Sequence, residues 1–369
     1  MKLVVFGLTI SSSWANGHAT LWRGLQHALA KRGWHVTFFE RNTTYYAQNR
    51  DLDRLSGGEL ILYEDWADIE ACARREVAEA EVAMVTSYCP DGTAATELVL
   101  GAPGALRVFY DLDTPVTLER LRRGESTTYI GPRGLADYDL VLSFTGGVAL
   151  EGLTSLAGAR DPIPLYGHVD PQIHRPAGSA ESYRADFSYI GTYAADRQAA
   201  LNRLFIEPAS YRPELRFVLA GAQYPQSFPW TKNIFFVRHL PPAQHASFYA
   251  SSRLTLNVTR SDMARMGWCP SGRLFEAAAC GTAILSDWWD GLDSFFEPGR
   301  EILVGQACDD VIAALDLPQE ELARIGAHAR ERVLAEHTSA HRAGQFEAMV
   351  AEAKSSRNRI ETREAAAEA

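Results

Sequence analysis

Residues 1–40 read MKLVVFGLTISSSWANGHATLWRGLQHALAKRGWHVTFFE, and they are the clearest guide to the architecture of this chain. The apolar run Leu3–Gly7 is typical of a strand buried on both faces, and His35–Glu40 predicts a second one. Between them, apolar residues recur at helical spacing until Gly33, which can end a helix. The apolar face of this helix consists of Leu21, Trp22, Leu25, Ala28 and Leu29. The stretch therefore predicts a right-handed βαβ unit of a parallel sheet.

The alternation of apolar runs and helical patterns continues, pauses at a proline-containing connector and then starts again. Before the connector we expect strands at Val82–Ser87, Leu106–Tyr110, Leu140–Phe144 and within 161–167. After it we expect strands at Phe187–Gly191, Leu215–Gly221, Ile234–Val237, Leu254–Thr259, Ala283–Asp287 and Glu301–Val304. The fold class is therefore α/β, with two Rossmann-like domains that face each other across a cleft and ligands beyond the carboxyl ends of the strands.

The domain boundaries follow from this rhythm. Residues 1–170 are expected to form the first domain and residues 171–337 the second. The pattern from 318 to 353 is helical, with one interruption near His337-Thr338. Residues 338–369 are expected to form a helix that crosses back to the first domain, and its polar end from Lys354 is expected to be a fraying helix or a disordered tail.

Composition limits the classes of function. The 369 residues carry a formal net charge of −10, which argues against broad binding to the phosphate backbone of nucleic acid. The cysteines show no C-x-x-C spacing and no nearby histidine ligand pattern, so neither a disulfide framework nor a zinc site is indicated; they are Cys72, Cys89, Cys269, Cys280 and Cys308. No apolar stretch is long enough for a membrane span. The opening run faintly resembles a signal peptide, but we prefer a buried first strand and a cytoplasmic location.

The segment PSGRLFEAAACG, residues 270–281, carries the most chemical information. Ser271 can cap the amino end of a helix and Gly281 can end it, while Gly272 would allow close approach of a ligand. A helix N-terminus is a suitable seat for a diphosphate. Arg273 and Glu276 share one face of this helix, where a guanidinium suits phosphate oxygens and a carboxylate suits a ribose diol. The alternative is an ion pair on the helix surface.

The string FEAAACG at 275–281, followed by a short strand, an acid and Gly291-Leu292, resembles the donor-binding segment of group 1 glycosyltransferases with the GT-B fold. The opening FGLTISSSW at 6–14 with GHATLWRG at 17–24 resembles the CgeB branch, named for a spore-maturation protein. The likeness extends from residue 1 to about residue 340. It implies that Ser271, Gly272 and Arg273 contact the donor diphosphate and that Glu276 binds the donor ribose.

The resemblance also assigns roles to three loops that follow strands in the second domain. It implies that Gly191, Thr192 and Arg197 face the donor phosphates, although Gly191 can equally serve a tight turn. It places His239 near the nucleobase, where this residue can also be an ordinary turn residue. Arg260 is a second candidate cation, and an Arg–Asp pair closing its loop is the alternative.

One position departs from the family pattern. Many retaining relatives place a glutamate eight residues before the ribose glutamate, and this chain has Trp268 there. The contacts to the donor sugar, and retention of anomeric configuration, are therefore open. Trp288 and Trp289 can stack on a sugar or base, but we expect at least one of them to be a core residue.

Candidate catalytic residues lie in the first domain. His18 follows the first strand and can act as a general base or stabilise developing charge, because imidazole groups titrate at about pH 6.5, or it can only hydrogen-bond the loop. Asp113, in the string YDLDTP, can be the base for the acceptor or a helix cap. Glu40 would grip ribose in a dinucleotide enzyme, but the loop after Gly7 lacks G-x-G-x-x-G.

The sequence therefore predicts a glycosyltransferase with an N-terminal acceptor domain and a C-terminal nucleotide-sugar domain. The nucleotide-sugar is a substrate, and no cofactor or metal is expected, since the helix N-terminus with Arg273 and either Arg197 or Arg260 can neutralise the diphosphate. Two alternatives remain: a nucleotide-sugar epimerase or hydrolase, and a nucleotide-sugar-binding protein without catalysis. The sugar, the nucleotide and the acceptor cannot be inferred from the residues.

Overall fold

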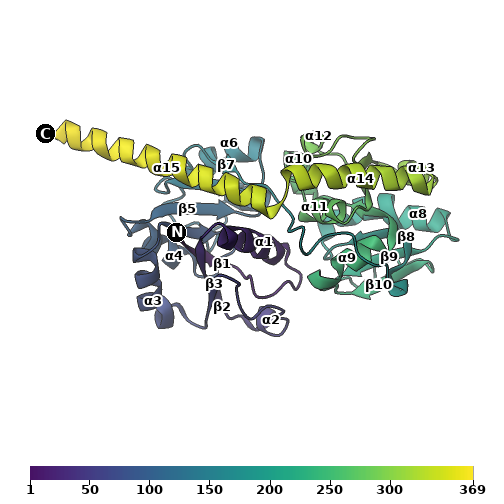
Figure 1. The fold of residues 1–369 in the computed structure, drawn as a ribbon, viewed down its shortest axis with the longest axis horizontal. Helices are drawn as coiled ribbons and strands as arrows, with labels where there is room; N and C mark the ends of the chain where they lie inside the picture. The colour runs from purple at the N-terminus through teal and green to yellow at the C-terminus, as the bar shows by residue number, and fades with distance from the viewer. Residues whose placement is uncertain (369) are drawn as a thin grey trace. The chain divides into compact units, whose positions relative to one another are not determined.

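The computed structural model describes residues 1–368; beyond residue 359, only the side chain of Thr362 is described. The chain forms two compact units. The first contains residues 1–12, residues 18–166 and the chain from Ala340 onward, and the second contains residues 13–17 and 167–339. Each unit is built around one fully parallel sheet covered by helices (Figure 1), as the alternating sequence pattern predicts.

The first unit holds a seven-stranded sheet in the order β3-β2-β1-β4-β5-β6-β7. Its strands are β1 (Lys2–Gly7), β2 (His35–Arg41), β3 (Gly58–Tyr63), β4 (Val82–Thr86), β5 (Leu106–Asp111), β6 (Leu140–Ser143) and β7 (Ile163–Pro164). Its helices before the connector are α1 (Gly17–Lys31), α2 (Thr44–Ala47), α3 (Trp66–Ala78), α4 (Gly92–Leu100), α5 (Thr114–Arg122) and α6 (Val148–Ala157). The expected strands are confirmed to within two residues at their ends where bounds were predicted, and β3 is an addition.

The second unit holds a six-stranded sheet in the order β10-β9-β8-β11-β12-β13. Its strands are β8 (Ala185–Ile190), β9 (Phe217–Gly221), β10 (Ile234–Arg238), β11 (Ser252–Asn257), β12 (Ala283–Ser286) and β13 (Leu303–Val304). Its longer helices are α9 (Pro242–Ala250), α11 (Gly272–Ala279), α13 (Cys308–Leu315) and α14 (Gln319–Glu336). Shorter helical segments are η1 (Glu181–Tyr183), η2 (Ala195–Arg197), α7 (Gln198–Leu201), η3 (Asn202–Ile206), α8 (Glu207–Tyr211), α10 (Ser261–Met266) and α12 (Leu292–Phe295).

The helix α1 shows how the sequence pattern becomes structure. Trp22, Leu25 and Leu29 are buried against the sheet, as the helical spacing predicts. Gly33 follows the helix with a φ of +85°, a conformation that glycine adopts without steric cost. The chain can therefore turn directly into β2, and the first strands pair in register from Lys2 opposite His35 to Gly7 opposite Glu40.

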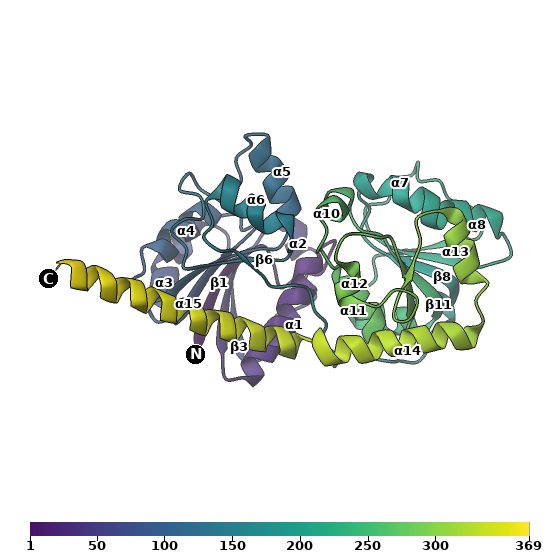
Figure 2. The ribbon, with the colours of Figure 1, turned by 90° about the horizontal axis from the view of Figure 1, so that it is seen from above.

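The last helix, α15 (Ser339–Glu368), belongs almost wholly to the first unit (Figure 2). Glu347 accepts hydrogen bonds from Arg32 Nε at 2.6 Å and from Trp34 Nε1 at 2.8 Å, and Phe346 is fully buried beside the Trp34 ring. The expected return of the C-terminal helix and the break near 337–338 are confirmed. The helix continues to Glu368, whereas residue 369 of the expected tail lies outside the described residues.

The first six strands of each sheet follow the same order, in which the chain starts in the middle, runs to one edge and then resumes on the other side of the first strand. The direction of the strand order reverses between β1 and β4 in one sheet and between β8 and β11 in the other. Loops at the carboxyl ends of such neighbouring strands diverge and leave room for a ligand. Within residues 1–368, no helix is long and apolar enough to cross a membrane.

Candidate functional site

Arg273 ties together the carboxyl ends of the two central strands of the second sheet. Its guanidinium donates to the Ile190 carbonyl at 2.9 Å, after β8, and to the Val258 carbonyl at 3.0 Å, after β11. Its Nε donates to the Ser271 hydroxyl at 3.1 Å. Ser271 takes the expected N-cap position of α11, but its side chain forms no hydrogen bond to the backbone N–H groups of the helix. The hydroxyl is used to orient Arg273.

Arg197 and Arg260 join Arg273 at this edge of the sheet. Arg197 donates to the Thr192 carbonyl at 3.0 Å, while its Nε has no hydrogen-bond partner among the described residues. Burial, together with the positive charges of Arg273 and Arg260, lowers the pKa of Arg197 from its ordinary value. Three mutually repelling cations at the carboxyl ends of β8 and β11 form a site that favours an anion.

Arg260 has a different partner from the one that its sequence suggested. Its Nε donates to Asp196 at 3.0 Å, whereas Asp262 pairs with Arg265 at 2.9 Å. The Arg–Asp alternative for this residue is therefore right in kind and wrong in partner. The pair joins the loop after β8 to the loop after β11, so it fixes the two segments that carry the cations.

The two glycines of the site are constrained in opposite ways. A Cβ on Gly191 would lie 2.6 Å from the Tyr189 hydroxyl and 3.0 Å from an Arg273 nitrogen, so the close packing there requires glycine. A Cβ on Gly272, at the start of α11, would meet nothing within 4 Å. The backbone at Gly272 therefore faces open space, where the N–H groups of the first helical turn can receive a ligand.

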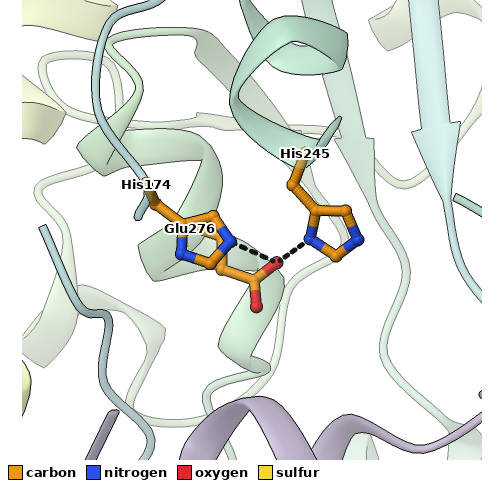
Figure 3. A group of neighbouring side chains, drawn as sticks. All are labelled: His174, His245 and Glu276. Atoms are coloured by element: carbon orange, nitrogen blue, oxygen red, sulfur yellow. Dashed lines mark hydrogen bonds and ion pairs between the residues drawn. The ribbon is translucent and has the colours of Figure 1, made fainter. Parts of the chain in front are cut away.

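Glu276, one turn into α11, is buried, and no ion pair joins it to Arg273 among the described residues, so the alternative of a surface ion pair is wrong. Its Oε2 lies 3.2 Å from His245 Nδ1 and 3.8 Å from His174 Nε2 (Figure 3). Burial alone would raise the pKa of Glu276, but the imidazoles of His174 and His245, with Arg273, lower it to about 2. The carboxylate is therefore ionised at neutral pH and remains an acceptor for hydroxyl groups.

Sequence reasoning missed His174 and His245. His174 lies in a turn of the connector and His245 lies on α9, so no spacing rule relates either of them to Glu276. His239, which was expected near the nucleobase, adopts a φ of +54° after β10, and its backbone N–H donates to the Gly221 carbonyl. Its ring lies 4.6 Å from the ring of Trp14.

In the first unit, His18 and Asp113 come together. His18 lies at the start of α1 and its Nε2 is 3.2 Å from Asp113 Oδ2. Asp113 occupies the N-cap position of α5, but its side chain forms no cap hydrogen bond. The cap alternative for Asp113 therefore does not describe its side chain, which contacts the imidazole. Both side chains are partly exposed, with 13% and 19% of their surface accessible, and can reach a ligand.

Glu40 has no capacity left for a ribose. Its carboxylate is fully buried and accepts four hydrogen bonds, from the Thr9 hydroxyl, the Ile10 N–H, and the N–H and hydroxyl of Ser11. These bonds shape the loop after β1. The Glu40 carboxylate is therefore not available to bind the ribose of a dinucleotide. The dinucleotide interpretation, already weakened by the absent glycine motif, loses its ribose ligand.

The aromatic candidates divide as expected. Trp289 is 2% exposed and belongs to the core, whereas Trp288 is 39% exposed. Trp268, at the position where the family resemblance leads one to expect a glutamate, packs its ring against Gly291, where a Cβ would approach it to 2.6 Å. Trp268 also has a φ of +48°, and its N–H donates to the Asp290 carbonyl. The indole is thus built into the local packing.

The C-terminal part of the sequence matches a known family. Residues 197–348 match the family described as glycosyl transferase-like, which is less than half of the chain. No curated protein has a matching sequence.

Several solved structures are similar over nearly the whole chain. Sucrose-phosphate synthase from Thermosynechococcus elongatus has a TM-score of 0.70 and 14% identity, over 96% of this chain and 100% of its own. An alpha-glucosyltransferase in complex with UDP and a 13-mer DNA has a TM-score of 0.69 and 12% identity, over 95% and 99%. HepE from Anabaena, in complex with UDP and glucose, has a TM-score of 0.64 and 10% identity, over 95% and 100%. The fold is GT-B.

Proposed function

We propose that this chain is a glycosyltransferase that holds a nucleotide-sugar donor on its second unit. The observation that carries the proposal is the cluster of Arg197, Arg260 and Arg273 at the carboxyl ends of β8 and β11. The departing nucleoside diphosphate gains negative charge as its bond to the sugar breaks. Guanidinium groups and a helix N-terminus that are fixed before the reaction stabilise this charge where it develops, so no metal is needed at the diphosphate.

The remaining donor contacts follow from the same edge of the sheet. Gly191 and Thr192 border the cations, and Ser271 and Gly272 begin α11. Glu276 offers an ionised carboxylate one turn further along, suited to the two adjacent hydroxyls of a ribose. His239, at the end of β10, is proposed to contact the base. The glycosyl transferase-like match over 197–348 and the UDP-containing structural neighbours support this assignment.

For the acceptor we propose the pair of His18 and Asp113 in the first unit. Asp113 takes the proton of the acceptor hydroxyl as the oxygen bonds to the anomeric carbon, while the electron pair of the broken bond leaves with the diphosphate. His18, 3.2 Å from the same carboxylate, orients it for proton transfer. The coarser assignment, a glycosyltransferase of GT-B fold, does not depend on these two residues.

The test is a thermal-shift screen against UDP, GDP, dTDP, ADP and CMP with their common sugar conjugates, and NAD as a control. A ligand at one hundred times its dissociation constant adds about 2.7 kcal/mol to the free energy of unfolding. We expect one nucleoside diphosphate to stabilise the protein and Arg273→Ala or Glu276→Ala to abolish that effect. UDP is the first to test, because the structural neighbours contain it.

The control is Arg324→Ala, which removes an exposed arginine of α14 whose ion-pair partner among the described residues is Glu321 on its own helix. Arg273 also satisfies three oxygen atoms of the protein, so its removal lowers stability by itself. The ligand effect is therefore compared with the same variant without ligand. Stabilisation by NAD and by no nucleoside diphosphate would overturn the proposal.

Trp268 supports a second candidate, a nucleotide-sugar-binding protein without catalysis. The indole occupies the position at which many retaining relatives carry a glutamate, and it is fixed by Gly291 and Asp290. Nucleotide-sugar binding with no transfer to an acceptor pool and no hydrolysis would favour this candidate. Sugar release to water alone would instead indicate a hydrolase.

A further inference from the structure

The side chains of His174, His245 and Glu276 converge on one point inside the second unit (Figure 3). They come from the connector, from α9 and from α11, and their nearest nitrogen and oxygen atoms all lie within 4.8 Å of one another. Both imidazoles approach the same carboxylate oxygen, Oε2 of Glu276. Two histidines and one carboxylate are a frequent protein ligand set for zinc.

The hydrogen bond made by Nε2 of His245 determines which of its ring nitrogens carries a proton. Its Nε2 lies 3.1 Å from the carbonyl oxygen of Leu240, an acceptor, so Nε2 carries a proton. In the neutral ring, Nδ1 then presents a lone pair to Glu276 Oε2 at 3.2 Å, which is also an acceptor. Two facing acceptors need a cation between them. A backbone carbonyl that fixes the imidazole tautomer in this way is typical of metal-binding histidines.

His174 supplies the independent observation. Its side chain is 2% exposed, and neither ring nitrogen has a hydrogen-bond partner among the described residues. A buried polar group without a partner is costly. The Nε2 of this ring lies 3.8 Å from Glu276 Oε2.

We propose that His174 Nε2, His245 Nδ1 and Glu276 Oε2 bind a divalent transition-metal ion of the zinc type. Zinc–nitrogen and zinc–oxygen bonds of about 2.0–2.2 Å place neighbouring ligands of a tetrahedral site about 3.3 Å apart. The observed separations from Oε2, 3.2 and 3.8 Å, lie close to this value, and the ligand atoms of the two histidines lie within 4.8 Å of each other, so the imidazoles would move toward the ion when it binds.

Three protein ligands leave one position of a tetrahedral zinc for water or another oxygen. Glu276 Oε1 accepts no hydrogen bond from the described residues, so it stays available to a hydroxyl group while Oε2 binds the ion. The metal is thus compatible with the proposed ribose contact and distinct from the arginine cluster. It departs from the sequence-based expectation of no zinc site and no metal. That expectation rested on the cysteine spacing, on the lack of a nearby histidine pattern and on the neutralisation of the diphosphate by arginines.

The test is a zinc titration of the full chain by calorimetry, after removal of any affinity tag and treatment with a chelator, in the absence of nucleotide. We expect one zinc ion per chain. Loss of a residue that only orients a ligand costs 10–100-fold in metal affinity, so His174→Gln, His245→Gln and Glu276→Gln should each cost at least about 100-fold. His35→Gln, which changes an exposed histidine at the start of β2, should leave the affinity unchanged.

Cobalt gives a readout that needs no variant. Co²⁺ added to the metal-free chain should produce the visible absorption of a four-coordinate site, and zinc should displace it. The proposal is overturned if the chain binds no stoichiometric zinc, or if His245→Gln and His35→Gln bind it equally. If the chain binds nucleotide normally but no zinc, the cation between His245 Nδ1 and Glu276 Oε2 is a proton, and the metal site is rejected. Zinc binding without nucleotide binding would sustain the metal site and contradict only the proposed function.

Discussion

Asp111 and Asp113 are two residues apart, yet the structure gives them different environments. Asp113 is partly exposed and contacts His18, whereas Asp111, at the end of β5, is fully buried. One oxygen of Asp111 accepts the Asp113 N–H at 3.0 Å, and Oδ2 has no hydrogen-bond partner among the described residues. Burial raises the pKa of Asp111 to about 6. One carboxylate is therefore accessible to a ligand, and the other reduces stability when it ionises.

Asp111→Asn should stabilise the protein at neutral pH. The folded state holds the Asp111 proton more tightly than the unfolded state does, so ionisation costs stability as the pH rises from about 4 to 6. Asparagine removes this cost and keeps the oxygen that accepts the Asp113 N–H. We expect a gain of about 1–3 kcal/mol at pH 7.5 that disappears near pH 4. Urea unfolding at both pH values measures it.

Asp139→Asn is the control with the opposite sign. Burial of Asp139 is outweighed by its bonds to Arg107, which lower the pKa of this carboxyl, so its contribution to stability is present at neutral pH and lost in acid. Its replacement should cost about 1–3 kcal/mol at pH 7.5. A loss of stability in both variants at pH 7.5 would contradict the role assigned to burial at Asp111.

Asp113→Asn should affect transfer and leave donor binding intact. Loss of a general base typically lowers the rate by 10²–10⁴-fold. Release of nucleoside diphosphate from the donor in the presence of an acceptor pool measures the rate, and the thermal shift with nucleotide measures binding. Normal transfer by this variant would remove Asp113 from the mechanism. A parallel loss of nucleotide binding would assign it a structural role instead.

The sequence predicted the residues of the cation cluster but not how each is used. Arg273 and Glu276 were identified because a helix N-terminus and a family resemblance coincide there. His174 and His245 were missed because they are 71 residues apart on unrelated elements, and only the folded chain brings them to Glu276. The role of Ser271 was misjudged, since its hydroxyl could bond to the helix or to Arg273 and the sequence cannot rank the two.

Among the elements, β3 shows where periodicity is too weak to predict a strand. It lies at the edge of its sheet, and of its residues only Tyr63 is buried. An edge strand buries little apolar area, so its sequence, GELILY, contains no continuous core pattern. The central strands β1 and β4 were predicted because almost every residue in them is buried.

The packing of α15 on the first unit leads to a prediction about the stability of that unit. Phe346→Ala should destabilise the first unit by about 3–5 kcal/mol, because the ring is fully buried beside Trp34. Glu352→Ala removes an exposed side chain from the same helix and should have almost no effect. Chemical denaturation compares the two. Equal stability of these variants would show that α15 contributes little to the first unit.

At the scale of the whole molecule, the two units share a sheet topology but carry different polar residues where the strand order reverses. The first six strands of each sheet share one order, but the reversal point of the second is lined by arginines and that of the first lies next to the loop that Glu40 organises. Two Rossmann-like domains could be inferred from the rhythm of the sequence, whereas the GT-B assignment came from the family resemblance. The proposed roles of the two units could not be inferred from this rhythm, because the pattern of apolar residues in a strand does not depend on the polar residues that follow it.

Calorimetry of the intact protein should separate the two units. A saturating nucleoside diphosphate should raise the melting temperature of one transition by roughly 5–10 °C, as expected for about 2.7 kcal/mol in a unit of this size. Phe346→Ala should lower the other transition. If the ligand and the substitution act on the same transition, the donor site is not confined to the second unit.

The return of α15 to the first unit has a consequence for biosynthesis. The first sheet is complete once Pro164 has left the ribosome, but the helix that covers Trp34 is translated only after the second unit, residues 167–339. At 5–20 residues per second, this interval lasts roughly 10–35 s. During that time the nascent first unit exposes apolar surface, whereas the second can fold as soon as it emerges. A chaperone that screens nascent chains should therefore associate with the first half of this protein and leave once α15 has packed on the first unit.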